Sequence, residues 1–373
     1  MDLDSYIASF DAEPGYLDWA AFGPLAPSVR SEVQADTELL GSGRASSIAL
    51  VADHEREARE LVAEVMGTTD ASRVVLQPST TYGLMHAIYG LAGGLMLGRG
   101  EFPSLTVAAT RAADALGSIQ LQWLDPQDGR ITPDVVREAL TDDTRALAVS
   151  LVDFRTGYRA DLPALREVLG DRLLIVDAIQ GFGMADVDYS AADVVCGHGY
   201  KWLRAGRGTG FAWFGDRALE RIAPILSGFA GVDGDLPVDA VPAPSASASA
   251  FSVAGPDTLA AARLAASLRE VAAVGVGSIE AELAARTADV MFFADRYDVP
   301  VVTPREPERR AGIVTLAPTP QDAAPLAASL ANHGLTVTAR GGRIRVAPHV
   351  GTGGDTLRLF GDALAAFSSG RVW

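Results

Sequence analysis

The middle of the chain reads Leu173-Leu174-Ile175-Val176-Asp177-Ala178-Ile179-Gln180, an apolar, β-branched run with a carboxylate near its end. A second such run, Ala192-Asp193-Val194-Val195-Cys196, is followed shortly by Gly199-Tyr200-Lys201-Trp202. Apolar runs of this length predict buried strands of an α/β sheet. Because ligands of such sheets bind at the carboxyl ends of the strands, we expect Asp177 and Lys201 to face one crevice. The alternative is a strand-end aspartate and a surface lysine that never meet.

An amine and a carboxylate offered to one crevice suit pyridoxal phosphate. Lys201 would carry this cofactor as a Schiff base, which requires an amine whose pKa is lowered by burial. When substrate displaces it, the free amine is placed to move the proton on the substrate's Cα. Asp177 would hold the ring nitrogen protonated, so that the ring draws electrons from Cα. We therefore predict that Lys201 and Asp177 are the catalytic residues.

The residues around both side chains resemble the class V aminotransferase family of fold-type-I pyridoxal-phosphate enzymes. The family pattern is D-x-x-Q or D-x-x-H, then K-W/Y-L, a Gly-rich turn and another strand. It is matched here by Asp177 to Gln180, Lys201-Trp202-Leu203, Gly206 to Gly210 and Phe211 to Phe214. The resemblance implies pyridoxal phosphate as cofactor and an α/β fold. In that fold a large mixed seven-stranded sheet lies between helices, and a smaller α+β domain closes the chain.

Length and composition set broad limits. The 373 residues suffice for a large core and two domains. The 47 acidic and 31 basic residues give a net charge of −16, which argues against nucleic acid or an anionic membrane surface as a partner. A single cysteine and an N-terminus without a basic segment favour a cytoplasmic protein. The uncharged run from Thr81 to Gly98 is as long as a membrane span, but its glycines and His86 favour a buried helix and its exit turn.

The order of patterned segments predicts three parts. Residues 1–14 form an N-terminal arm, residues 15–240 a large cofactor-binding domain, and residues 241–373 an interdomain crossing with a small α+β domain. The stretch from Pro237 to Ala250 is rich in Pro, Ala and Ser, which fits a flexible linker. The resemblance instead implies an ordered crossing that approaches the site of a partner subunit. It thereby implies a homodimer with shared active sites.

Phosphate binding is expected at Ser79-Thr80-Thr81, which follows the strand-like run from Arg73 to Leu76 and precedes a helical pattern. Hydroxyls and backbone N–H groups at a helix N-terminus bind anions. An ordinary N-cap explains these residues equally well, and the resemblance favours phosphate. Similarity to the kynureninase branch, where a Tyr-Lys pair occurs, adds Tyr200 as a donor to the phosphate, with His198 as an alternative.

Two residues are expected around the cofactor ring. The amide of Gln180 would donate to the phenolic oxygen of the cofactor; a turn residue is the alternative. Phe102, in the run Glu101-Phe102-Pro103-Ser104, stands where many family members place a histidine over the ring. The run is similar to the F-P-T of kynureninases. A phenyl ring stacks on the pyridine but carries no proton, and a core phenylalanine is the alternative.

Substrate binding is expected in the segment Arg343-Ile344-Arg345-Val346-Ala347-Pro348-His349, which resembles the R-I-S-P-H of the family. The family arginine clamps the α-carboxylate of an amino-acid substrate with its planar guanidinium. Arg343 and Arg345 alternate on a strand and share a face, so spacing leaves both open. Alignment to Pro348-His349 selects Arg345; a solvated edge-strand arginine is the alternative. No metal site is expected.

The chain departs from the family in three places. The run from Leu151 to Tyr158 resembles the kynureninase H-V-N-Y-K-T-G-Y, but has leucine for the histidine and Asp153 for the asparagine. The only cysteine, Cys196, falls in a predicted buried strand, which argues against a persulfide-forming cysteine desulfurase. Pro256 stands where a family threonine reaches the phosphate of the neighbouring subunit.

Together these residues predict an enzyme that uses pyridoxal phosphate, held by Lys201, on an α-amino acid. The kynureninase-like runs favour cleavage of a Cβ bond, by a carbon–sulfur lyase or a kynureninase-like hydrolase. Transamination is the alternative reaction. A pyridoxal-phosphate-binding regulatory protein without turnover is the alternative class, although a pure cofactor binder needs no substrate clamp such as Arg345.

Overall fold

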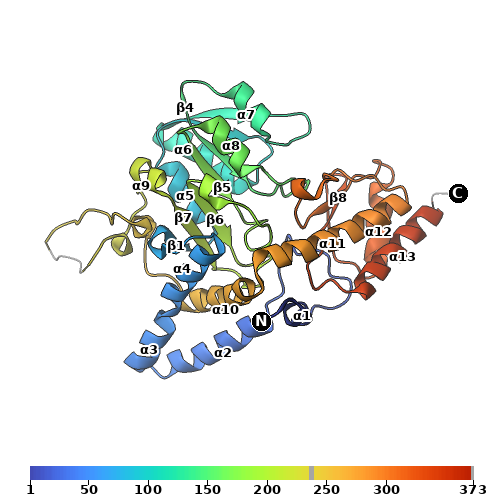
Figure 1. Cartoon of the computed structure of the whole chain (residues 1–373), viewed down its shortest axis with the longest axis horizontal. Helices are drawn as coiled ribbons and strands as arrows, with labels where there is room; N and C mark the ends of the chain where they lie inside the picture. The colour runs from blue at the N-terminus through green and yellow to red at the C-terminus, as the bar shows by residue number, and fades with distance from the viewer. Residues whose placement is uncertain (235–238, 371–373) are drawn as a thin grey trace.

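The computed structural model describes residues 1–234 and 239–370. Its centre is a seven-stranded mixed sheet in the order β1-β7-β6-β5-β4-β2-β3. β7 runs antiparallel to both of its neighbours, and the remaining strands are parallel to one another. Helices cover this sheet, and a second, smaller layer of structure lies beside it (Figure 1). The predicted fold class is confirmed.

The strands of the large sheet are short and mostly apolar. They are β1 (Val74–Gln77), β2 (Gly93–Gly98), β3 (Ile119–Leu124), β4 (Thr144–Ser150), β5 (Leu173–Asp177), β6 (Val194–His198) and β7 (Gly210–Phe214). Successive side chains of a strand point to opposite faces, so alternate residues enter two cores. In β5, Leu174 and Val176 join one core, and Leu173 and Ile175 join the other. Burial on both faces explains why this strand reads as a continuous apolar run.

The helices divide between the two cores. One core receives apolar residues from α4 (His54–Val65), α7 (Pro133–Ala139), α8 (Leu162–Leu169) and α10 (Thr258–Val274). The other receives them from α5 (Thr80–Tyr89), α6 (Pro103–Leu116) and α9 (Asp216–Arg221). Two further helices, α2 (Pro27–Gly41) and α3 (Ala45–Ala52), pack outside the first core against α10.

A three-stranded antiparallel sheet forms the smaller layer, in the order β8-β10-β9. Its elements are β8 (Val314–Leu316), β9 (Thr338–Arg340) and β10 (Arg343–Val346), with α12 (Ala323–Asn332) and α13 (Gly354–Gly370) packed on them. The long helix α11 (Val276–Arg296) joins the two layers. Its residues Ile279 and Leu283 lie in a core of the large sheet, whereas Val290 and Met291 lie in the core of the small one.

The N-terminal segment runs along the small layer. After α1 (Leu3–Ala8), an extended run places Tyr16 and Asp18 in β-bridges to residues of that layer. Leu17, between them, is fully buried in the core of the small layer. This run carries Asp18 from the start of the chain to the neighbourhood of β10. The division of the chain into an arm (residues 1–14), a large domain (15–240) and a crossing with a small domain (241–373) stays a prediction.

Two expected elements differ in detail. The strand expected to end at Cys196 continues to His198 as β6. The uncharged run from Thr81 to Gly98 contains most of α5 and all of β2, rather than a helix and a turn. Nowhere in residues 1–234 and 239–370 does a helix combine the length and the apolar character that crossing a membrane requires.

The expected crossing is only partly described. Its first residues, Pro237 and Val238, lie outside the described residues. Further along, Ala248 and Ala250 are buried, and Phe251 stacks on Phe214 of β7 with ring centres 3.9 Å apart. This part of the segment is therefore packed on the sheet, as expected for an ordered crossing rather than a flexible linker.

Candidate active site

The predicted site residues gather at one edge of the large sheet, where its parallel strands end. Ser79 follows β1, Phe102 follows β2, Asp177 is the last residue of β5, and Lys201 follows β6. Since the carboxyl ends of parallel strands share an edge, the strand order brings together residues that are far apart in sequence. A cleft of about 700 Å³ opens at this edge, and its lining includes Phe102, Gln180, Tyr200, Lys201 and Arg345.

Lys201 is buried, with 5% of its surface exposed. This burial lowers the pKa of its amine to about 8; the charge of Asp177 opposes the shift and that of Arg345 adds to it. A cation in poorly solvated surroundings is costly, so burial favours the neutral amine. The Nζ atom lies 5.7 Å from the ring centre of Phe102 and 5.5 Å from that of Tyr200. About half of the Lys201 side chains thus carry a free amine near pH 8.

Lys201 is also the only lysine among the 373 residues, whereas arginine occurs 30 times. A guanidinium stays protonated and forms no Schiff base, so none of the other basic side chains can carry a cofactor in this way. A plain residue count singles out Lys201 without any motif. This count is a signal in the sequence that is independent of the family motifs.

Asp177 is 2% exposed, and burial raises the pKa of its carboxyl to about 6. The backbone N–H of Ile179, which donates to Oδ1 at 3.1 Å, and the nearby Lys201 both act to lower it. Among the described residues only Oδ1 accepts a hydrogen bond. The other oxygen remains for a protonated ring nitrogen, so this carboxyl fits the predicted cofactor.

Two buried polar atoms near the sheet edge, Thr80 Oγ1 and His198 Nε2, have no hydrogen-bond partner in the part of the chain that is described. β7 lies between β1, which precedes Thr80, and β6, which contains His198: Gly210 pairs with Gln77 on one side and with His198 on the other. A Cβ at Gly210 would lie 2.6 Å from the Cα of Ser79, so glycine is needed there. Ser79 makes no side-chain cap to α5. The free hydroxyl, ring nitrogen and helix N-terminus fit a phosphate group.

The remaining predicted phosphate contacts, Thr81, Tyr200 and His198, also touch neighbouring side chains. Thr81 shares a 2.7 Å hydrogen bond with Ser104 at the start of α6. Tyr200 lines the cleft, and the guanidinium of Arg207 lies 4.6 Å from its ring centre. Burial raises the pKa of Tyr200, so the phenol stays protonated and is able to donate. His198 packs edge-on against Tyr200 at 4.5 Å, and burial lowers its pKa to about 3, so its ring is neutral.

Gln180 is held by two hydrogen bonds. Its Nε2 donates to the carbonyl of Ala20 at 3.1 Å, and its Oε1 accepts from the indole N–H of Trp202 at 2.8 Å. The indole is a donor only, so it fixes which end of the amide is oxygen. One N–H of Gln180 then remains available in the cleft, as the predicted donation to the cofactor requires. Trp202 of the K-W-L motif orients this amide.

Phe102 is no core residue, since 37% of its surface is exposed and it lines the cleft. It packs edge-to-face on Phe154, with ring centres 5.2 Å apart. Phe154 belongs to the loop that resembles the kynureninase run, and it lines the cleft as well. The loop therefore contributes an aromatic wall.

Arg345 lies on β10 and is held by a residue that the sequence analysis missed. Its Nη2 donates to Asp18 at 3.1 Å and to the hydroxyl of Thr338 at 3.2 Å. Each side chain of the Arg345–Asp18 pair is 13% exposed, and the buried Nε of Arg345 has no partner in residues 1–234 and 239–370. Arg343 lines the same cleft but is exposed. The shared face of the two arginines is thus observed, and only Arg345 is anchored.

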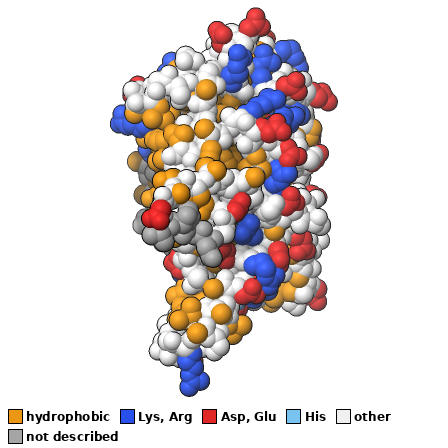
Figure 2. All heavy atoms as spheres, turned by 90° about the vertical axis from the view of Figure 1, so that its left-hand side faces the viewer, with side chains coloured by type: hydrophobic (Ala, Val, Ile, Leu, Met, Phe, Trp, Pro, Cys, Tyr) orange, Lys and Arg blue, Asp and Glu red, His pale blue; other side chains and the backbone are white. Residues whose placement is uncertain are grey.

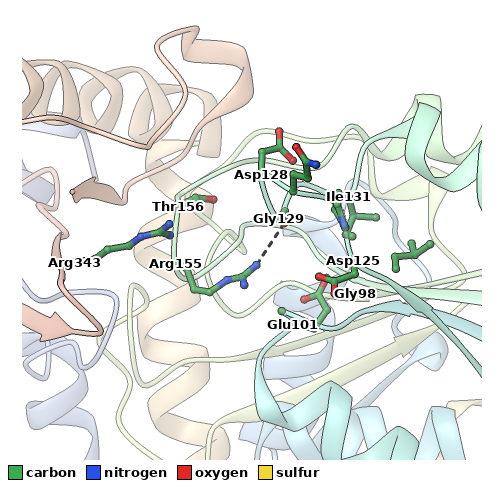
Figure 3. A pocket seen from close by; sticks show the side chains of 13 residues that line it. Gly98, Glu101, Asp125, Asp128, Gly129, Ile131, Arg155, Thr156 and Arg343 are labelled. Carbon is green, nitrogen blue, oxygen red and sulfur yellow. Dashed lines mark hydrogen bonds between the residues drawn. The ribbon is translucent and has the colours of Figure 1, made fainter. Parts of the chain in front are cut away.

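A second pocket of about 200 Å³ adjoins the cleft and shares Glu101, Arg155 and Arg343 with it (Figure 3). Burial raises the pKa of Glu101 to about 7, and its carboxyl accepts hydrogen bonds from the backbone N–H and the hydroxyl of Ser150. Arg155 donates to Asp153 at 2.9 Å. Asp153 also accepts from backbone and hydroxyl groups of its own loop, so it stabilises this loop rather than facing the cofactor.

Cys196 lies in β6 and is fully buried. Burial raises the pKa of its thiol, so the protonated form is favoured and the thiolate that a nucleophile requires is disfavoured. Its predicted position in a buried strand is observed.

The sheet order and the lysine–aspartate pair at the strand ends define a fold-type-I pyridoxal-phosphate protein. A model of the family named Aminotransferase class-V matches residues 16–353, and the chain belongs to this family. The predictions of the family, of pyridoxal phosphate as cofactor and of an enzyme are confirmed at this level.

Several known proteins are similar to this chain. The kynureninase of Deinococcus radiodurans is 28% identical over 214 residues, which cover 55% of this chain and 50% of that protein. The cysteine desulfurase IscS of Ectopseudomonas mendocina is 30% identical over 190 residues, 47% of this chain and 46% of that protein. The matches thus span about half the length of these curated relatives.

Two solved structures share the fold over almost their whole length. The apo structure of a cysteine desulfurase from Thermococcus onnurineus NA1 has a TM-score of 0.84 at 20% identity, covering 96% of this chain and 95% of that one. A cystine C–S lyase in complex with its product, cysteine persulfide, has a TM-score of 0.84 at 18% identity, covering 96% and 98%.

Proposed function

We propose that this chain is a pyridoxal-phosphate enzyme that acts on an α-amino acid and cleaves a bond at its Cβ, as a carbon–sulfur lyase or a kynureninase-like hydrolase. The supporting observation is the position of its single lysine. Lys201 is buried, its pKa is lowered, and it follows the strand that pairs with the end of β5, where Asp177 is buried. When bound, the cofactor supplies an electron sink for charge that develops on the substrate's Cα.

Each residue at the strand ends has a separate role toward the cofactor. Lys201 holds it through its amine and, once freed by substrate, takes or returns a proton at Cα. Asp177 keeps the ring nitrogen protonated with its free oxygen. Gln180 would donate to the phenolic oxygen, and Phe102 would cover the ring face.

Phosphate and substrate are bound at separate places. Ser79, Thr80, Thr81, His198 and Tyr200, at and near the N-terminus of α5, would hold the cofactor phosphate through hydrogen bonds. Arg345 binds the α-carboxylate of the substrate, and Asp18 keeps its guanidinium in one orientation.

The choice of reaction rests on what the cleft contains. Phe102 carries no proton over the ring, and the buried Cys196 is unsuited to form a persulfide on the protein. This disfavours a desulfurase that relies on its own cysteine. Among reactions that cleave a bond at Cβ, this favours those in which the fragment departs directly, the reaction class suggested by similarity to a kynureninase and to a cystine C–S lyase.

Product analysis with a panel of amino acids tests the reaction. Pyruvate or alanine formed together with the released side-chain fragment supports cleavage at Cβ. Formation of the keto acid that corresponds to the substrate, with amino transfer to the cofactor, would replace it with transamination. If the cofactor is attached to Lys201 but no substrate gives a product, the chain is a binding protein without turnover.

We also propose a homodimer in the cytoplasm, with sites near the subunit interface. Apolar side chains gather on the face that carries the described part of the segment between α9 and α10 (Figure 2). Phe229, Val253 and Tyr82 are between 49% and 63% exposed. Tyr82 and Val253 also line a pocket with Gly210 and Pro256, beside the expected phosphate site. A second copy that covers this surface would close that side of the site.

A further inference from the structure

The hairpin of the small sheet places two arginines side by side. β9 ends at Arg340, β10 begins at Arg343, and the two residues are directly opposite in the antiparallel register. Gly341 and Gly342, with φ of +58° and +74°, form the two-residue turn between them, a conformation that favours glycine. Both arginines are exposed and line the cleft that contains Lys201. Like charges placed directly opposite each other destabilise a sheet.

Carboxylates neutralise other arginines of the cleft but not these two. Arg345 pairs with Asp18, and Arg155 pairs with Asp153. No carboxylate of the described residues lies within ion-pair distance of Arg340 or Arg343. As a whole, the cleft is lined by five arginines and one lysine against the single carboxyl of Glu101, although the chain carries a net charge of −16.

The proposed function does not use the hairpin arginines. In that proposal Arg345 binds the α-carboxylate, and of the five residues that would hold the cofactor phosphate only Tyr200 lines this cleft. The positive charge at the hairpin tip therefore remains for another anion.

A third arginine, Arg155, lines the cleft from the large sheet, and its guanidinium is directed toward Gly129 (Figure 3). Nη1 of Arg155 makes no hydrogen bond within the described residues and packs so closely on Gly100 that a Cβ there would collide with it. In Figure 3, Arg343 reaches from the small layer toward the loop that carries Arg155 and Thr156. Arginines of both layers thus line the pocket that contains Glu101.

We propose that Arg340 and Arg343, with Arg155 in the lining of the same cleft, form a second anion subsite, and that the substrate is an α-amino acid whose side chain ends in a carboxylate, sulfinate or phosphate. The inference rests on the proposed function, because Lys201 and Arg345 place the amino and carboxylate groups at the other end of the substrate. An anion between the hairpin arginines relieves their repulsion and receives charge-assisted hydrogen bonds from them. The subsite selects the substrate and takes no part in the bond-breaking step.

The first test uses the apoprotein and needs no turnover. Thermal unfolding is followed with succinate, and with butyrate as a monoanion of the same chain length. Succinate is expected to raise Tm more than butyrate does, and the double variant Arg340→Gln/Arg343→Gln is expected to lose this difference. Arg111→Gln, at an arginine of α6 that is 69% exposed, is the matched control and keeps it. An equal response to both acids, or a difference that persists in the double variant, overturns the proposal.

The second test uses the holoenzyme. Half-saturating concentrations are read from the change in cofactor absorption with L-aspartate, L-cysteine sulfinate and O-phospho-L-serine, and with L-alanine and L-serine as neutral controls. At least one anionic amino acid is expected to half-saturate at a concentration about tenfold lower than the neutral ones, and the preferred one identifies the terminal group. Arg343→Gln should remove that preference. Equal half-saturation of all five overturns the subsite. Absence of cofactor absorption from the unmodified protein would instead overturn the proposed function, so the two failures are distinguishable.

Discussion

Asp18 and Arg345 are 327 positions apart in the sequence and form a 3.1 Å ion pair beside the cleft. The hydroxyl of Thr338 donates to Asp18 at 2.8 Å, so the carboxylate is itself held in place. A planar guanidinium fixed at one edge presents its remaining donors in one direction, which suits two-point binding of a carboxylate. The ion pair therefore prepares Arg345 for its proposed role.

Arg345→Lys should weaken binding of all amino-acid substrates alike, because an ammonium keeps the charge but loses the fork. We expect half-saturating concentrations to rise by about ten- to a hundredfold for neutral and anionic substrates, the equivalent of about 1.5–3 kcal/mol for a charge-assisted hydrogen bond. Titration of the cofactor absorption measures this. Arg358→Lys, at an arginine that is 68% exposed, is the matched control. Unchanged half-saturation in Arg345→Lys would assign the α-carboxylate to another residue.

Lys201 should be the only side chain that retains the cofactor after borohydride reduction, because the chain has no other lysine. Peptide mapping by mass spectrometry locates the label. Lys201→Arg keeps a positive charge but provides no reactive amine, so we expect no label and no detectable turnover. The circular dichroism of the variant should match that of the parent, which separates lost chemistry from lost folding. A label confined to the N-terminal amine would refute the assignment.

Cofactor uptake by the apoprotein should depend on pH through the amine of Lys201. Burial lowers its pKa from an ordinary value near 10.5 to about 8, so the reactive free base is about a tenth of the protein at pH 7 and about nine tenths at pH 9. The rate of uptake, followed by absorption, should rise through pH 8. In Asp177→Asn the midpoint should move to lower pH, because the charge of Asp177 raises the pKa of Lys201. A midpoint near pH 10 in the parent would contradict the burial argument.

Much of this site could be predicted from the sequence because its catalytic residues belong to local patterns. Asp177 ends an apolar run and Lys201 precedes a Gly-rich turn, so strand ends and spacing suffice to bring them together. Asp18 has no such pattern around it. Its role follows from the packing of Leu17 into the small core, which places the neighbouring carboxylate beside β10.

The hairpin is an intermediate case. Gly341 and Gly342 between two arginines signal a tight turn in the sequence. Whether Arg340 lies over the cleft depends on how the small layer is placed against the large sheet, and spacing along one strand contains no such information. Spacing could not show which of Arg343 and Arg345 binds substrate either, because both lie on the same face of β10. The two arginines differ only in the residues that surround them.

Cys196→Ser should keep turnover at close to the parent rate. The thiol is fully buried in β6, and burial raises its pKa, so it contributes packing rather than a nucleophile. The serine hydroxyl is more polar, and we expect the free energy of unfolding to fall by about 1–3 kcal/mol if it finds no partner. Initial rates and chemical denaturation measure the two effects. Loss of turnover in a folded Cys196→Ser protein would instead support a desulfurase that uses Cys196 as its nucleophile.

The last prediction concerns the apolar face between α9 and α10. Phe229 is 63% exposed. The preceding residue, Gly228, lies against the backbone of Val253, and its N–H donates to the carbonyl of Ser252 at 2.9 Å. If a second copy covers this surface, sedimentation velocity should show a dimer that survives dilution, because large apolar interfaces dissociate slowly. Phe229→Asp would bury a charge at that interface and should shift the protein toward the monomer.

Phe292→Asp is the matched control for this change, since Phe292 on α11 is 59% exposed and lies in another part of the fold. It should leave the sedimentation coefficient unchanged. Because the pocket lined by Val253 and Pro256 borders the expected phosphate site, the Phe229→Asp monomer should also lose cofactor faster on dialysis than the control. An unmodified protein that sediments as a fully active monomer would show that each site is complete within one chain.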